Sequence, residues 1–211
     1  MKLYRSIRQY AGHPIPHQIM ISLLKKYHQP NDKIHQLMKQ GALIGIKKGL
    51  YIAGPEITSQ RPHPFLLASH ITGPSYVSME SALSYYGMIP EKVYEITSVT
   101  VKSSRRFPTA AGLFSYTRLP LPYYSYGIRS VEAAGGQYFL IASPEKALFD
   151  KIVTTAGVDF RSRTSVLAYM ENDLRIDAEM LKQLNSAEME SWLEAALKKK
   201  SLERLIEIIQ L

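Results

Sequence analysis

The 211-residue sequence contains no cysteine. This absence excludes disulfide frameworks, zinc–thiolate sites, iron–sulfur ligation and thiol catalysis. Long apolar runs are missing as well, and the polar, basic start MKLYRSIRQYAGH lacks the apolar core of a signal peptide. We therefore expect a protein of the reducing cytoplasm without a membrane anchor.

Recognisable catalytic motifs are also missing. The sequence has no phosphate-binding glycine-rich loop and no G-x-S-x-G, and His63 and His70 lack a carboxylate cluster with metal-ligand spacing. Ser143 and Lys146 fit S-x-x-K, but the accompanying S-D-N and K-T-G elements are absent. The same residues suit a helix start, with Ser143 as N-cap and Lys146 paired with Asp150. We expect no enzyme activity, no metal and no cofactor.

Positive charge, by contrast, is concentrated at the start of the chain. Residues 1–54 carry nine Lys and Arg against one acid, residues 55–142 carry seven against five, and residues 143–211 carry ten against twelve. The first segment therefore accounts for the whole net charge of +8. Such concentration is typical of a surface that contacts a polyanion, because each phosphate contact releases condensed counterions. A merely solvated basic face is the alternative.

The chain has the composition of a folded globular protein, with 45% apolar and 21% charged residues. Residues 54–64 are rich in proline and polar residues, which is typical of a boundary between domains. We predict one domain over 1–54 and a second over 64–211.

The apolar spacing in the first domain predicts three helices, over 1–10, 17–27 and 31–40. Asn31 is the expected N-cap of the third helix, and Gly41 is expected to end it. The second helix places four apolar side chains on one face: Met20, Leu23, Leu24 and Tyr27.

Two β-strands are expected next, over 42–46 and 49–53. Lys47 and Lys48 form the turn between them, and Gly49 suits a positive φ. A hairpin with two lysines at its tip, following three helices, is typical of a winged helix-turn-helix domain that binds DNA.

The third helix has a polar and mainly basic side opposite its apolar side. In a helix-turn-helix this helix enters the major groove, where lysine suits phosphate or guanine and glutamine suits adenine. The hairpin lysines would lie over the flanking backbone. The predicted DNA-contacting residues are Asn31, Lys33, Gln36, Lys39, Gln40, Lys47 and Lys48. A protein-interaction module with the same fold is the alternative.

The rest of the chain mixes helical and β patterns. Helices are expected near 64–71 and 79–86, β-rich runs at 94–102, 113–118 and 138–142, and helices from 144 onward. The expected fold class is therefore α+β, with an N-terminal winged helix-turn-helix followed by a mixed α/β domain with a helical C-terminal tail.

Several segments, in this order, resemble the AbiEi antitoxins of bacterial abortive-infection systems. They are 47–51 (KKGLY), 76–87 (YVSMESALSYYG), 89–91 (IPE), 97–100 (TSVT) and 143–150 (SPEKALFD). The resemblance extends to about residue 155, and beyond residue 158 the tail is similar only in being helical.

The resemblance implies a type IV antitoxin whose winged helix represses its own operon and whose second domain neutralises a toxin. The implied partner is an AbiEii-type nucleotidyltransferase, which need not be bound directly. The basic recognition helix and wing of the family correspond to Lys33, Gln36, Lys39, Lys47 and Lys48.

Two other functions stay open at this point. The first is a winged-helix transcription factor whose C-terminal domain senses a ligand or dimerises. The second is a nucleic-acid-processing enzyme, which would need clustered acids for a divalent metal, and the spacing of the acids does not supply such a cluster.

Overall fold

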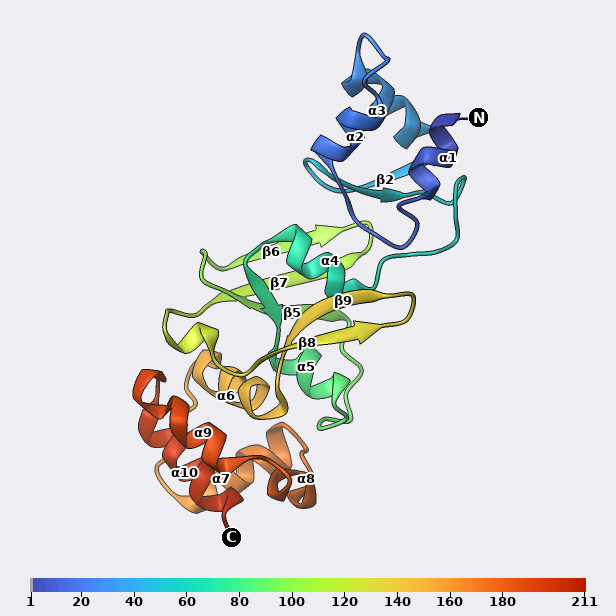
Figure 1. Ribbon diagram of the computed structural model, residues 1–211. Coiled ribbons are helices and arrows are strands. Elements are labelled where there is room, and N and C mark those ends of the chain that lie inside the picture. Colours follow the sequence, from blue (N-terminus) through green and yellow to red (C-terminus); the bar gives the residue numbers. More distant parts are fainter. Residues whose placement is uncertain (1) are drawn as a thin grey trace.

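The structure is a computed structural model that describes residues 2–211. It is a mixed α+β protein, as the sequence predicts, and its strands form two separate β-sheets. Figure 1 shows an N-terminal body, a sheet-containing body and a group of C-terminal helices following one another, so that the two termini lie at opposite ends.

The N-terminal body contains three helices and a small antiparallel sheet in the order β1-β3-β2. Its elements are α1 (Lys2–Arg8), β1 (Ile15–Pro16), α2 (His17–Leu23), α3 (Pro30–Lys39), β2 (Leu43–Lys47) and β3 (Leu50–Ala53). Side chains from all three helices meet in its core, including Ile7, Met20, Leu24, Ile34 and Leu37.

Two sequence predictions for these helices are wrong. Helix α3 begins at Pro30 with Gln29 in the N-cap position, so Asn31 is not the cap. The fixed φ of proline suits the first helical position, and this sets the start. Helix α2 ends at Leu23, which leaves Tyr27 in a turn with 42% of its surface exposed. The predicted positive φ is confirmed at Gly49, and Gly41 follows the end of α3 as predicted, also with a positive φ.

The second body is built on a six-stranded mixed sheet in the order β6-β7-β5-β4-β9-β8. Helices α4, α5 and α6 pack against its central strands. The elements are α4 (Pro64–Ile71), β4 (Ser75–Val77), α5 (Met79–Tyr85), β5 (Glu95–Thr100), β6 (Arg105–Thr109), β7 (Gly112–Arg118), the 3-10 helix η1 (Tyr123–Ser125), β8 (Ile128–Ala133), β9 (Gln137–Ala142) and α6 (Pro144–Thr154).

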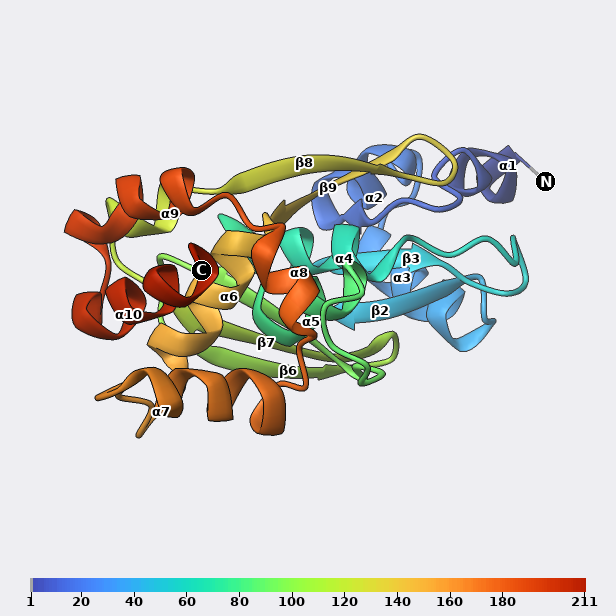
Figure 2. The ribbon, with the colours of Figure 1, turned by 90° about the horizontal axis from the view of Figure 1, so that it is seen from below.

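The chain ends in a group of short helices at the end of the molecule far from the N-terminal body (Figure 2). They are α7 (Arg163–Ala168), the π-helix η2 (Tyr169–Asp173), α8 (Ala178–Lys182), α9 (Ser186–Trp192), the 3-10 helix η3 (Leu193–Ala195) and α10 (Lys199–Ile209). Trp192 packs edge-to-face on Phe149 of α6, with ring centroids 6.0 Å apart. The predicted helical tail is therefore confirmed, and it belongs to the core of the second body.

The hairpin β2–β3 contributes to two hydrophobic cores. Leu43 and Ala53 are paired across the hairpin and belong to the N-terminal core. Ile46, Leu50 and Ile52 belong instead to the core of the second body. One hairpin thus joins the segments 1–54 and 64–211. Within residues 2–211, no helix combines the length and the apolar character that crossing a bilayer requires.

Candidate nucleic-acid interface

Helix α3 turns a polar face away from the N-terminal core. Ile34 and Leu37 are buried, whereas Asp32, Gln36 and Lys39 are exposed. At 100° per residue these three polar side chains lie on the side of the helix opposite the buried pair. The exposed face therefore presents an amide and a cation together with one carboxylate.

A groove of about 590 Å³ separates α3 from the hairpin. Asn31, His35 and Met38, which are one helical turn apart, line its helical wall. Lys47 and Lys48 line the opposite wall. Three of the predicted DNA-contacting residues, Asn31, Lys47 and Lys48, are therefore brought together around one concave surface.

The other four predicted residues lie outside this groove, with Lys33, Gln36 and Lys39 on α3 and Gln40 as its C-cap. The Nζ of Lys33 donates a hydrogen bond of 2.8 Å to Oε1 of Gln36, and it lies 5.4 Å from the ring centroid of Tyr27. Gln40 faces α1, where its Oε1 accepts a 3.5 Å hydrogen bond from the Tyr4 hydroxyl. Gln36 and Lys39 are thus the predicted residues that extend the groove across the exposed face of the helix.

The two hairpin lysines differ in their surroundings. The Nζ of Lys47 donates a hydrogen bond to the carbonyl oxygen of Ile71 at the end of α4. Burial and the nearby charge of Lys102 lower the pKa of Lys47. Lys48 is exposed and forms no hydrogen bond or ion pair through its side chain with any residue from 2 to 211. Lys48 is therefore the lysine whose charge is available at the hairpin tip.

Two histidines in the groove were not among the predicted residues. His35 is exposed on α3, and His17 begins α2 with its Nδ1 3.4 Å from the Tyr51 hydroxyl oxygen. Counting formal charge misses both, because neutral histidine adds none. The four-residue spacing of Asn31 and His35 on one helix is the signal that would have indicated His35.

The S-x-x-K segment is a helix start, as predicted. Ser143 is the N-cap of α6, and its Oγ accepts a 3.2 Å hydrogen bond from the Lys146 backbone nitrogen. Pro144 occupies the first helical position. The predicted pair of Lys146 and Asp150 forms with a 2.7 Å separation, and both side chains are completely buried. Without any exposed surface they cannot reach a solute.

This buried pair is embedded in hydroxyl and aromatic groups. The hydroxyls of Tyr76 and Ser78 donate hydrogen bonds of 3.0 Å and 2.7 Å to Oδ2 of Asp150. The Nζ of Lys146 lies 3.3 Å from the ring centroid of Tyr123, which is a close cation–π contact. Burial and the adjacent carboxylate raise the pKa of Tyr123 well above its ordinary value.

The two histidines considered for a metal serve local roles. Nδ1 of His63 accepts a 3.2 Å hydrogen bond from the Phe65 backbone nitrogen, and Nδ1 of His70 lies 3.0 Å from the carbonyl oxygen of Leu66. Among residues 2–211 no group of three or more His, Asp or Glu side chains is arranged to hold a metal ion.

Comparison with models of known protein families gives no match, and comparison with curated protein sequences gives none either.

Proposed function

We propose that residues 1–54 form a winged helix-turn-helix domain that binds double-stranded DNA. The order of helix, strand, two helices and hairpin, with the strands arranged β1-β3-β2, supports this fold. In this proposal α3 is the recognition helix and β2–β3 is the wing.

The observation that carries the proposal is the groove between α3 and the hairpin. Its lysines lie beside the exposed face of a helix that carries Gln36 and Lys39, in the segment that accounts for the whole net charge. The major groove of DNA accepts one α-helix, which would be α3, while the wing lysine Lys48 reaches the flanking phosphates.

Binding to a duplex from the promoter region of the chain's own gene tests this proposal. Measured by fluorescence anisotropy, a Gln36→Ala/Lys39→Ala variant is expected to weaken binding at least tenfold, because it removes one base contact and one phosphate contact. Gln183→Ala/Lys200→Ala is the matched control, since it removes one exposed amide and one exposed lysine outside the N-terminal body. Equal losses in both variants would contradict an interface on α3.

We further propose that the protein is a cytoplasmic, non-enzymatic antitoxin of a type IV system that represses its own operon. The ordered segments similar to AbiEi antitoxins support this role. Two of these segments form α5 and α6, which pack against each other and share an ion pair between Glu80 and Lys151. The proposed partner is an AbiEii-type nucleotidyltransferase toxin, neutralised with or without direct binding.

Co-expression with a nucleotidyltransferase toxin encoded beside the gene tests the antitoxin role. Growth rescue is expected for the wild type and also for Gln36→Ala/Lys39→Ala, because that variant changes only the exposed face of α3. Point variants are preferable to deletion of residues 1–54, since the deletion would remove Ile46, Leu50 and Ile52 from the second core. Absence of rescue by the wild-type chain would overturn the antitoxin role.

A second candidate function is a winged-helix transcription factor whose C-terminal domain senses a ligand. One observation favours it, namely a basic cleft between the hairpin and the second body.

A further inference from the structure

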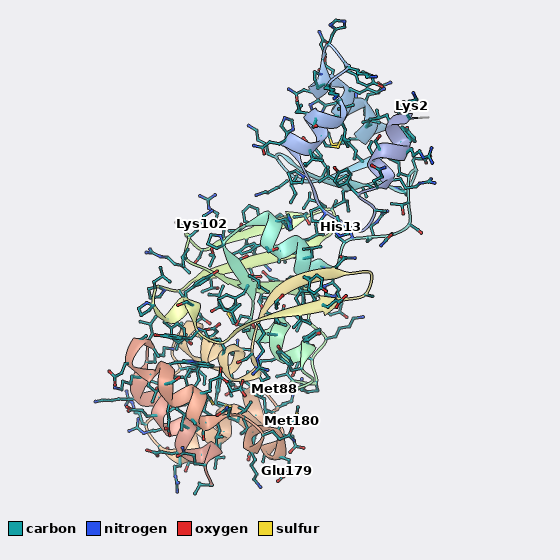
Figure 3. All side chains as sticks on the ribbon, viewed as in Figure 1. Lys2, His13, Met88, Lys102, Glu179 and Met180 are labelled. Carbon is teal, nitrogen blue, oxygen red and sulfur yellow. The ribbon has the colours of Figure 1, made fainter. Side chains whose placement is uncertain are left out.

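A cleft of about 840 Å³ lies where the end of β2 meets the second body. Five basic side chains line it: Lys47 from β2, His70 from α4, Lys102 from the loop after β5, Arg105 from β6 and Arg118 from β7. Figure 3 shows Lys102 at the edge of the second body on the side of the N-terminal body. Segments far apart in the sequence thus converge on one concave, positively charged surface.

Nothing in the lining neutralises this charge. The lining residues include no Asp or Glu, and none of the four Lys and Arg side chains forms an ion pair within residues 2–211. Lys47 and Lys102 are instead held by backbone carbonyls, those of Ile71 and Gly73. Each ammonium group has three N–H donors, so two remain for a ligand.

The two arginines of β6 differ in whether a carboxylate neutralises them. Arg106 forms two hydrogen bonds, of 2.9 Å and 2.7 Å, with the carboxylate of Glu95. Its neighbour Arg105 points to the opposite face of the strand, as alternation requires, and lines the cleft. Within the described chain, the guanidinium groups of Arg105 and Arg118 form no hydrogen bond with protein atoms.

One part of the cleft is apolar. Ile71, Val101 and Phe107 line it, and Phe107 packs edge-to-face on Tyr116 with centroids 5.7 Å apart. The ring of Phe107 is therefore fixed by its own packing. Cavities of a few hundred to about a thousand Å³ that combine an apolar wall with a few convergent polar groups are the usual form of small-molecule sites.

We propose that this cleft binds a phosphorylated small molecule with two or more phosphate groups, such as a nucleoside diphosphate. The phosphates would contact Arg105, Arg118 and Lys102, and the organic part would lie on the wall formed by Val101 and Phe107. Guanidinium groups suit this role because they bind phosphate through two parallel hydrogen bonds.

Two features favour a small molecule over the backbone of a DNA duplex. The cations line a concavity between two bodies instead of a protruding surface, and the apolar wall has no counterpart in a phosphodiester contact. Burial and the charge of Lys102 lower the pKa of Lys47, which shows that the cleft holds like charges together; any bound polyanion would relieve that repulsion. The site itself does not depend on the proposed DNA binding.

Isothermal titration calorimetry of the full chain with inorganic pyrophosphate and with ADP, at constant ionic strength, tests the inference. We expect saturable 1:1 binding of both, with ADP tighter because it also covers the apolar wall. Arg105→Gln/Arg118→Gln should weaken binding at least tenfold, whereas Arg106→Gln should change it less than twofold. Lys102→Gln should also weaken the binding of both probes, which is an independent test of the same site. All of these side chains are exposed, and thermal unfolding would verify that each variant is folded.

Two results would overturn the inference. They are no binding of either probe and an equal loss of binding in Arg106→Gln. If neither probe binds and Arg105→Gln/Arg118→Gln also loses duplex binding, the cleft belongs to the DNA interface. Specific ADP binding by a wild-type chain that fails to bind DNA would support the cleft and overturn the proposed function alone.

Discussion

Lys146 Nζ lies 2.7 Å from Oδ1 of Asp150, and neither side chain has any exposed surface. Removing two charges from water is costly, and the loss is offset only where geometry and further hydrogen bonds are good. Here the hydroxyls of Tyr76 and Ser78 donate hydrogen bonds to the Asp150 carboxylate, and the ring of Tyr123 covers the Lys146 ammonium group. The pair links α6 to β4 and η1, so its integrity bears on the stability of the second body.

Breaking this pair on one side is expected to be strongly destabilising. Lys146→Met should lower the free energy of unfolding by about 3–5 kcal/mol, because it leaves the Asp150 carboxylate buried without a cation. Equilibrium urea unfolding of the full chain measures the change. Adding Asp150→Asn to Lys146→Met should recover at least about 1 kcal/mol relative to the sum of the single variants. Strict additivity would show that the two groups do not interact.

The stability of the protein should fall as the pH drops below that at which a free histidine titrates. Burial lowers the pKa of His63 in the folded state, so the unfolded chain binds more protons in the interval between the lowered value and 6.5. Protonation would also remove the Nδ1 acceptor that caps the Phe65 nitrogen at the start of α4. Stability from this group is therefore present above pH 6.5 and is lost as the pH falls through the interval.

His63→Asn keeps a side-chain acceptor without a titrating ring. Denaturant unfolding of both proteins from pH 7.5 to 5 should show a shallower loss of stability in the variant. Because the other histidines are common to both proteins, the difference isolates His63. Parallel curves would contradict the assignment.

Gly54 is expected to tolerate no side chain. A Cβ atom at this position would lie 2.0 Å from the carbonyl oxygen of Gly41, at the base of the hairpin, where the Gly54 nitrogen donates a hydrogen bond to the carbonyl oxygen of Ala42. Because this oxygen belongs to the backbone, the clash can be relieved only if the base of the hairpin moves. Gly54→Ala should therefore lower the free energy of unfolding by more than about 3 kcal/mol. Gly87→Ala is the control, because that position has only a positive φ and open space, with an expected cost of about 1 kcal/mol. Thermal and urea unfolding compare the two.

The two hairpin lysines should contribute unequally to DNA binding. Lys48→Ala is expected to reduce the slope of log K against log salt by about 0.9, the value for one phosphate contact. Lys47→Ala should reduce it less, because the Lys47 ammonium group is held by the Ile71 carbonyl. Anisotropy titrations between about 50 and 200 mM salt measure both slopes. A larger effect of Lys47→Ala would show that its side chain leaves Ile71 when DNA binds.

Local patterns predicted much of the fold. The apolar stripe that places Ile34 and Leu37 in the core also fixes which side of α3 is exposed, and Ser143 and Pro144 mark the start of α6. These features depend on residues within one or two helical turns, where sequence spacing and geometry are directly related. The predicted contacts of this face with DNA stay predictions.

Features that depend on long-range contacts were not predictable in this way. Strand β1 has only two residues, and β8 carries a mixed pattern in IRSVEA, so neither gives a periodic signal. The pairing of Lys146 and Asp150 followed from their spacing, but its complete burial depends on Tyr76 and Tyr123 from distant segments. Likewise, only the folded chain brings Lys47 to the end of α4.

The hairpin β2–β3 packs into both hydrophobic cores, with Leu43 and Ala53 in one and Ile46, Leu50 and Ile52 in the other. A chimera that replaces residues 1–54 with a domain from a different protein would therefore have to reproduce the hairpin surface that the second body requires. Exchange of the three N-terminal helices alone, with the hairpin retained, is the graft that this architecture permits. The exposed face of α3 can thus vary in sequence while the hairpin stays constrained by its second neighbour.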